Sequence, residues 1–166
     1  NSDGDMQKKI LTDQSIYYGN VSMPEHWEID RIELSHHILQ SNLTDTKLQL
    51  SKTFDKLNDY VREHINLKYS FNLINKETWG NIYKPNETTV PFLNVDPVDL
   101  RNSPDYTLLY GVKTKDCMVR IYYDDNRRKG RSWDIEIKEN MFIMFPSTNM
   151  YYLTNNQKDS LNFVQT

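Results

Sequence analysis

The histidines of this 166-residue chain come first, because imidazole is the most common metal ligand and general base in proteins. Four are present, His26, His36, His37 and His64, and none follows residue 64. All four fall in segments where we expect helices. His36 and His37 are adjacent and would point to different helix faces, whereas a chelating pair needs a spacing of three or four residues. We expect these side chains to be partly exposed polar residues, with no metal site among them.

A basic cluster is the second group that could do chemistry. Four positive charges fall within five residues: Arg127, Arg128, Lys129 and Arg131. The flanking pattern predicts a hairpin tip there, where phosphate or an acidic protein surface could bind. The alternative is a solvated turn, neutralised in part by the two aspartates just before it. We favour the turn, because one cluster without adjacent exposed aromatic residues is weak support for nucleic-acid binding.

Carboxylates and the single thiol indicate no further site. Five aspartates could supply oxygens to a hard cation such as calcium: Asp96, Asp99, Asp105, Asp124 and Asp125. Their spacing matches no known calcium loop, and surface solvation explains them better. Cys117 has no cysteine partner and lies in an alternating segment that no histidine follows. We expect a buried, inert thiol.

Composition favours a soluble globular protein. Apolar residues make up 37% and charged residues 26% of the chain, and the net charge is −3. This balance gives no reason to expect nucleic acid or an anionic membrane as a partner. The sequence has no run long enough to cross a membrane and no signal-peptide character at its start, so we expect a cytoplasmic protein. We predict a flexible N-terminus over residues 1–14 and a single domain over 15–166.

Helices are expected over residues 25–65. The first should begin near Pro24 and end at about Gln40. The second has the clearest pattern in the chain, an apolar stripe with spacings of three and four residues: Leu50, Phe54, Leu57, Val61 and Ile65. Such a stripe is typical of an amphipathic helix that packs on a core. Thr44 and Asp45 could cap its start.

A β sandwich is expected over residues 67–166, with a short lead-in strand at 16–20. Residues 67–74 alternate between apolar and polar side chains, which predicts a half-buried edge strand. The exposed edge of that strand leaves a homodimer open. Residues 79–83 continue the β pattern. A long irregular connection then spans residues 87–105, and loops of this length are usually functional.

The C-terminal half has the clearest strand pattern. Residues 119–123 and 133–137 alternate on either side of a polar tip, which predicts a hairpin. Residues 141–145 are almost wholly apolar, as in a strand buried on both faces. Short strands follow near 150–153 and 160–165. Helices followed by strands indicate an α+β protein with N-terminal helices packed on an antiparallel sandwich or jelly roll.

A family resemblance can now be stated. The bend Phe145-Pro146-Ser147 after an apolar strand, the segment Trp79–Tyr83 and a loop that opens at Pro91 resemble the phage-type branch of the iron(II)- and 2-oxoglutarate-dependent oxygenases. The resemblance implies a cupin-like double-stranded β-helix from about Trp79 to the C-terminus, with helical support before it. Similarity to marine phage proteins implies a location in the host cytoplasm or in a virion.

The resemblance also implies a facial triad of two histidines and one carboxylate, with a basic residue for 2-oxoglutarate. Asn94 falls at the first histidine position, Asp96 at the carboxylate and Tyr151 at the distal histidine. The basic position falls near Ser160, and Lys158 is the nearest cation, which adds Lys158 to the candidate anion-binding residues. An amide and a neutral phenol bind iron(II) poorly. We therefore predict a degenerate pocket with no catalytic residue, no metal and no cofactor.

Two functional hypotheses follow. The first is a non-catalytic double-stranded β-helix module, an accessory or structural protein. Its barrel mouth, 87–105 loop and basic tip would bind an unknown protein or small molecule. The second is an active oxygenase that holds iron(II) and 2-oxoglutarate in an atypical shell around Asp96, or through a helix histidine such as His64. The absence of histidine after residue 64 favours the first. A sugar-binding or isomerase-like jelly roll with an organic pocket also stays open.

Overall fold

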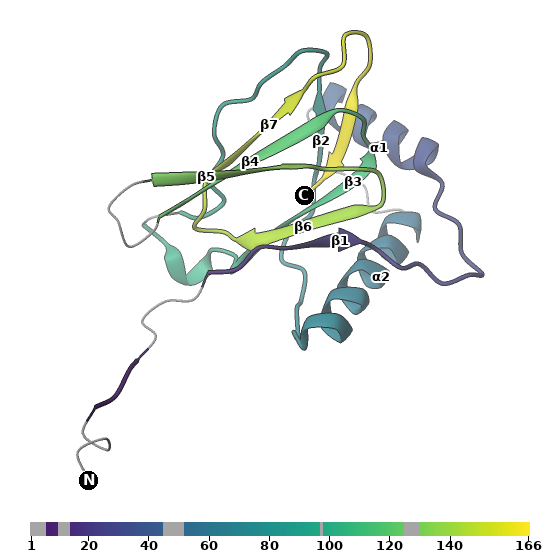
Figure 1. The fold of residues 1–166 in the computed structure, drawn as a ribbon. Helices are drawn as coiled ribbons and strands as arrows, with labels where there is room; N and C mark the ends of the chain where they lie inside the picture. The colour runs from purple at the N-terminus through teal and green to yellow at the C-terminus, as the bar shows by residue number, and fades with distance from the viewer. Residues whose placement is uncertain (1–5, 10–13, 45–51, 97, 125–129) are drawn as a thin grey trace.

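A computed structural model describes residues 6–9, 14–44, 52–96, 98–124 and 130–166. Within them lie two α-helices and eight β-strands (Figure 1). In chain order these are β1 (Tyr17–Asn20), α1 (Arg31–Thr44), α2 (Lys52–Tyr69), β2 (Gly80–Tyr83), β3 (Tyr106–Lys113), β4 (Cys117–Asp124), β5 (Gly130–Glu136), β6 (Met141–Pro146), β7 (Tyr151–Asn155) and β8 (Asn162–Gln165). None of the helices in this part of the chain has the length and apolar character to span a bilayer.

The strands form two antiparallel sheets that face each other. One has five strands in the order β1-β6-β3-β8-β2, and the other has three in the order β5-β4-β7. Two isolated bridges, Thr88 to Thr154 and Phe92 to Tyr151, bring the 87–105 connection alongside β7. That connection otherwise holds only a short 3₁₀ helix (Leu100–Asn102) in its described part. The predicted α+β class, with an antiparallel double-stranded β-helix, is confirmed.

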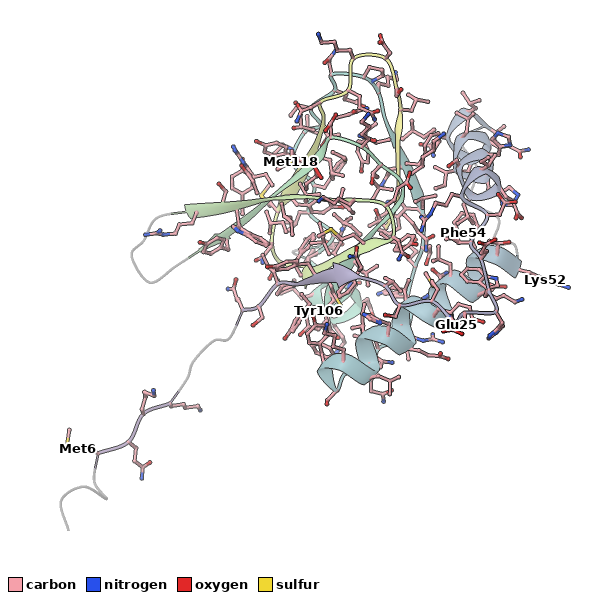
Figure 2. All side chains as sticks on the ribbon, turned by 45° about the vertical axis from the view of Figure 1, so that its right-hand side comes forward. Met6, Glu25, Lys52, Phe54, Tyr106 and Met118 are labelled. Atoms are coloured by element: carbon pink, nitrogen blue, oxygen red, sulfur yellow. The ribbon has the colours of Figure 1, made fainter. Side chains whose placement is uncertain are left out.

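The helices cover the outer face of the five-stranded sheet. Four residues of the predicted α2 stripe are buried, namely Phe54, Leu57, Val61 and Ile65. They share one apolar cluster with sheet residues such as Tyr110 and Phe142. Figure 2 shows Phe54 between the two helices, where its ring also stacks on His37. The stripe therefore supplies the contact that holds the helices on the sheet.

A second apolar cluster fills the space between the two sheets. It joins Leu109, Ile143 and Val164 of the large sheet to Ile121 and Leu153 of the small one. The predicted hairpin is present, with Val119 opposite Ile135 and Ile121 opposite Trp133. The first five residues of β6 are buried, as expected for a strand covered on both faces. The interior of the barrel is thus a packed core.

The first helix differs from the prediction. It begins at Arg31 and ends at Thr44, whereas the sequence pattern placed it from about Pro24 to Gln40. An Asp30 side-chain oxygen accepts a hydrogen bond from Glu33 N at 3.0 Å and so caps the helix start. Arg31 then donates to Val112 O at 2.8 Å, which ties this first turn to β3. The proposed caps at Thr44 and Asp45 do not precede α2 directly, because Thr44 ends α1 and Asp45, like Leu50, lies outside the described residues.

The predicted strand over residues 67–74 was wrong. Helix α2 continues to Tyr69, because Tyr69 lies four residues after Ile65 and prolongs the buried stripe. Ser70 then adopts a φ of 58°, which ends the helix. Tyr69, Phe71 and Leu73 still pack against the core, with the rings of Tyr69 and Phe71 at 4.7 and 5.1 Å from the Tyr17 ring, whereas Leu67 is exposed. Residues 67–74 therefore present no exposed strand edge through which a homodimer could form.

Gly111 allows a close approach of two backbone segments, and we predict that Gly111→Ala destabilises the protein. A Cβ at this position would collide with the backbone carbonyl of Lys138, which cannot move as a side chain can. The free energy of unfolding, measured by urea denaturation, should fall by about 3 kcal/mol, the upper end of the usual cost of overpacking. Gly130→Ala is the matched control, because no atom lies within 4 Å of a Cβ built there. Equal stability of the two variants would contradict this packing argument.

Candidate functional site

One end of the barrel, which we call the mouth, holds four of the five candidate residues that the structure describes, Asn94, Asp96, Tyr151 and Arg131. It comprises residues 92–96, 105–107, 121–123, 131–133 and 146–151. The strand register brings these segments together, with Tyr106 opposite Pro146, Ile121 opposite Tyr151, and Phe92 bridged to Tyr151. The 87–105 connection therefore reaches the same end as the β4–β5 hairpin.

A polar network lies at the mouth. Asn94 Nδ2 donates to Thr107 Oγ1 at 3.1 Å and to Tyr151 Oη at 3.3 Å. Thr107 Oγ1 and Ser147 Oγ are 2.9 Å apart and share a further hydrogen bond. Thr107, Ser147 and Tyr151 are buried. The structure thus brings together two of the three triad positions, Asn94 and Tyr151, and adds two hydroxyls that sequence reasoning missed.

Asp96 does not join this network. Its side chain is exposed, and its Oδ1 accepts a hydrogen bond from Val98 N at 2.9 Å. Its own backbone N donates to Ser103 Oγ at 2.9 Å. Such contacts are typical of an aspartate that stabilises a turn. The carboxylate of Asp96 therefore shapes the loop at this point.

Aromatic rings surround Tyr151 below the network. The ring of Phe145 lies 5.1 Å away and that of Phe92 lies 5.6 Å away, both between ring centroids. Burial raises the pKa of the Tyr151 phenol, although the hydrogen bond with Asn94 opposes that shift. Burial also raises the pKa of Tyr83, whose hydroxyl has no hydrogen-bond partner in the described structure. Both phenols stay neutral at physiological pH.

The opposite end of the barrel is closed by buried amides. Asn155 Nδ2 donates to Tyr83 O and to Ser160 O, each at 2.9 Å. Asn162 Oδ1 accepts from Lys115 N at 2.8 Å. The buried side-chain amides at this end therefore satisfy backbone donors and acceptors of the neighbouring segments.

The candidate anion-binding residues do not form one site. Arg131 is exposed at the start of β5, near the mouth, whereas Lys158 is exposed in the turn after β7, at the opposite end. Ser160, near which the basic position was expected, is exposed as well. Arg127, Arg128 and Lys129 lie outside the described residues, so their predicted role stays a prediction.

The histidines belong to the helical layer. His64 faces Phe142 on the outer side of the large sheet, with 6.0 Å between ring centroids, and its Nδ1 accepts from Ser22 N at 3.4 Å. Burial and nearby Lys68 lower its pKa. His26 and His36 are exposed. The described residues contain no group of three His, Cys, Asp or Glu side chains that could hold a metal ion. A helix histidine therefore does not reach the mouth.

Two hollows mark the surface. One of about 420 Å³ lies beside the mouth, between Ile16 and Tyr18 of the N-terminal segment and Tyr123 and Trp133 of the hairpin. Another of about 670 Å³ extends from α2 and residues 72–79 along the outer face of the large sheet to the mouth, where Asn94 and Thr107 of the polar network help to line it. The sequence showed that Tyr18 and Trp133 would alternate along strands. It gave no sign that their rings would meet, 5.3 Å apart.

The comparisons with known proteins support the fold. No family model and no curated protein sequence matches this chain. The crystal structure of a Pseudomonas putida prolyl-4-hydroxylase is similar, with a TM-score of 0.61 and 12% sequence identity, and the alignment covers 92% of this chain and 83% of that one. This likeness shows a shared double-stranded β-helix architecture. At this identity it assigns no activity to the present chain.

The residues at the mouth do not fit an iron(II) centre of the kind that the oxygenase resemblance implies. The amide of Asn94 is engaged with Thr107 and Tyr151, and the Tyr151 phenol is neutral. The Asp96 carboxylate is held in a loop turn. Neutral amide and phenol oxygens are poor substitutes for the imidazole and carboxylate ligands of such centres.

The buried thiol of Cys117 predicts a specific loss of stability at alkaline pH. Burial raises its pKa to about 12, whereas an unfolded cysteine titrates near about 8.5. Between these values the unfolded chain has lost the proton and the folded protein keeps it, so the free energy of unfolding falls as pH rises. The slope should approach roughly 1.4 kcal/mol per pH unit between about pH 9 and 10.

Urea denaturation at several pH values checks this prediction. Cys117→Ala should remove the contribution of the thiol, up to roughly 1.4 kcal/mol per pH unit, and leave the smaller slope from the buried tyrosines, which grows as the pH approaches their ordinary pKa of about 10. An unchanged slope in that variant would show that another group causes the alkaline loss.

Proposed function

We propose that this chain is a non-catalytic double-stranded β-helix module that binds a partner through the barrel mouth. The observation that carries the proposal is the hydrogen bond between Asn94 and Tyr151, at two positions where the resemblance implies histidine ligands. The Asn94 amide donates this hydrogen bond, and the Tyr151 hydroxyl oxygen accepts it. The pair lies over the apolar core between the sheets, with Tyr151 buried and Asn94 at the border of the larger hollow.

The packing around Tyr151 supports this proposal. The phenol ring contacts Phe92 and Phe145, so apolar surface fills the space below the network. A ligand with charged oxygens would have to displace these rings and would lose their buried contacts. The stabilisation that the aromatic side chains provide therefore opposes an open active site.

The position where a basic residue would bind 2-oxoglutarate supports the same proposal. The distal carboxylate of 2-oxoglutarate needs a buried cationic partner. In the described part of the chain no lysine or arginine is buried, and Lys158 is exposed. The buried residue nearest the expected basic position is Asn162, and its amide is bonded to the backbone of Lys115.

The proposal extends to the biological setting of the protein. The resemblance to phage proteins supports an accessory or structural role in the cytoplasm of a host cell or in a virion. The exposed 87–105 connection and the basic hairpin tip would serve as parts of the binding surface.

An anaerobic titration with iron(II) and 2-oxoglutarate tests the proposed loss of chemistry. Metal-free protein should develop no visible charge-transfer band and should retain no iron after desalting, because a neutral amide and a neutral phenol bind iron(II) poorly and the Asp96 carboxylate is exposed in a loop turn. The Asp96→Ala variant should behave like the parent protein. A saturating band that Asp96→Ala abolishes would overturn the proposal and identify an oxygenase with a remodelled metal shell.

A further inference from the structure

The larger hollow runs along the helical side of the large sheet. Its floor is the outer face of that sheet, which contributes Leu108, Tyr110, Met144 and Gln165. One wall is α2, with Asn58 and Arg62, and the other is the segment of residues 72–79 that follows this helix. A volume of about 670 Å³ falls within the range of pockets that hold small organic molecules.

Gln165 of β8 places an unsatisfied polar atom at this floor. The residue is only 5% exposed, and its Nε2 donates a hydrogen bond to Asn58 Oδ1 of α2. Its Oε1 is buried and accepts no hydrogen bond in the described part of the chain. A buried carbonyl oxygen without a donor is costly, and folded proteins usually satisfy such atoms. A ligand that carries O–H groups would supply the missing donor.

Side-chain amides recur around the larger hollow. Five of them line it: Asn58, Asn72, Asn75, Asn94 and Gln165. Each amide has an oxygen that accepts hydrogen bonds and an NH₂ group that donates them. A hydroxyl group also both donates and accepts, so neighbouring hydroxyls of one ligand can pair with such amides in either direction. The lining therefore suits a ligand rich in hydroxyl groups.

The charged residues of the lining favour an uncharged ligand. Within the described structure they are Arg62, Lys76, Glu77 and Asp105. Arg62 is already paired with Asp59, Nη2 to Oδ1 at 2.9 Å, and Lys76 adjoins Glu77 in the chain. The lining therefore has no cluster of one charge sign that would select an anion or a cation.

Trp79 adds an aromatic surface to the wall. It precedes β2 directly, and its backbone N and O atoms are bonded to Thr166 at 2.9 and 2.8 Å. Because these bonds use its main-chain groups, the half-buried indole is the part that a ligand can contact. An indole face can pack on the C–H face of a sugar ring while the hydroxyls at the ring edge reach polar groups. An aromatic ring beside several amides is thus suited to a saccharide.

We propose that the larger hollow binds a neutral saccharide. One hydroxyl would donate to Gln165 Oε1, others would pair with the amides around it, and the sugar ring would pack on Trp79. The inference goes beyond the partner binding proposed for the mouth, because Gln165, Asn58 and Trp79 do not belong to the polar network there.

Saturation-transfer difference NMR on the full chain provides the test, with neutral mono- and disaccharides, charged sugars and nucleosides as probes at about 10 mM. At least one neutral saccharide should bind, since this concentration nearly saturates a site with a Kd of about 1 mM. Gln165→Met should weaken its binding about tenfold or more, because this variant keeps the side-chain length and removes the amide. Trp79→Leu should also weaken binding. The matched control Trp27→Leu removes an indole that packs on Tyr60 outside the hollow, and it should bind like the parent.

Side-chain amide resonances give a second measurement that needs no variant. The saccharide should shift the NH₂ signals of Gln165 and Asn58 and leave that of Asn155, at the opposite end of the barrel, unchanged. The proposal would be overturned if no neutral saccharide bound, or if nucleosides or charged sugars bound in preference. Undiminished binding by Gln165→Met, or an unshifted Gln165 signal, would overturn it as well. Iron binding by a protein that still binds the saccharide would overturn the proposed function alone.

Discussion

The burial of both faces of the five-stranded sheet is the constraint on which the rest of the structure depends. Strand β6 lies between β1 and β3, and its apolar residues contact the helices on one side and the small sheet on the other. Each face needs its own cover, since exposed apolar surface of this size would be costly in water. The helices supply one cover and the β5-β4-β7 sheet supplies the other.

That constraint also explains the character of the mouth. The space between the sheets is filled by Phe145, Tyr151 and their neighbours, and such a core leaves polar groups only where they can bond to one another. Asn94, Thr107, Ser147 and Tyr151 meet this condition as a closed network.

The sequence predicted the fold well where hydrophobic period and length agreed. The α2 stripe, the β4–β5 hairpin and the buried β6 all appear as expected. Residues 67–74 misled the prediction, because Leu67, Tyr69, Phe71 and Leu73 alternate as in a strand. Tyr69, however, also continues the helical stripe from Ile65. Packing against Tyr17 decides between two periods that are both present in the sequence.

By itself the sequence determined the class of fold and the absence of histidine from the β region, since both depend only on residue type and local spacing. The tertiary structure alone decided that Asn94 and Tyr151 bond to each other while Asp96 remains in a loop turn. It also decided that Tyr18 and Trp133 face each other at the edges of two sheets. Residues far apart in the chain meet only after the strands have paired, and no local pattern records that pairing.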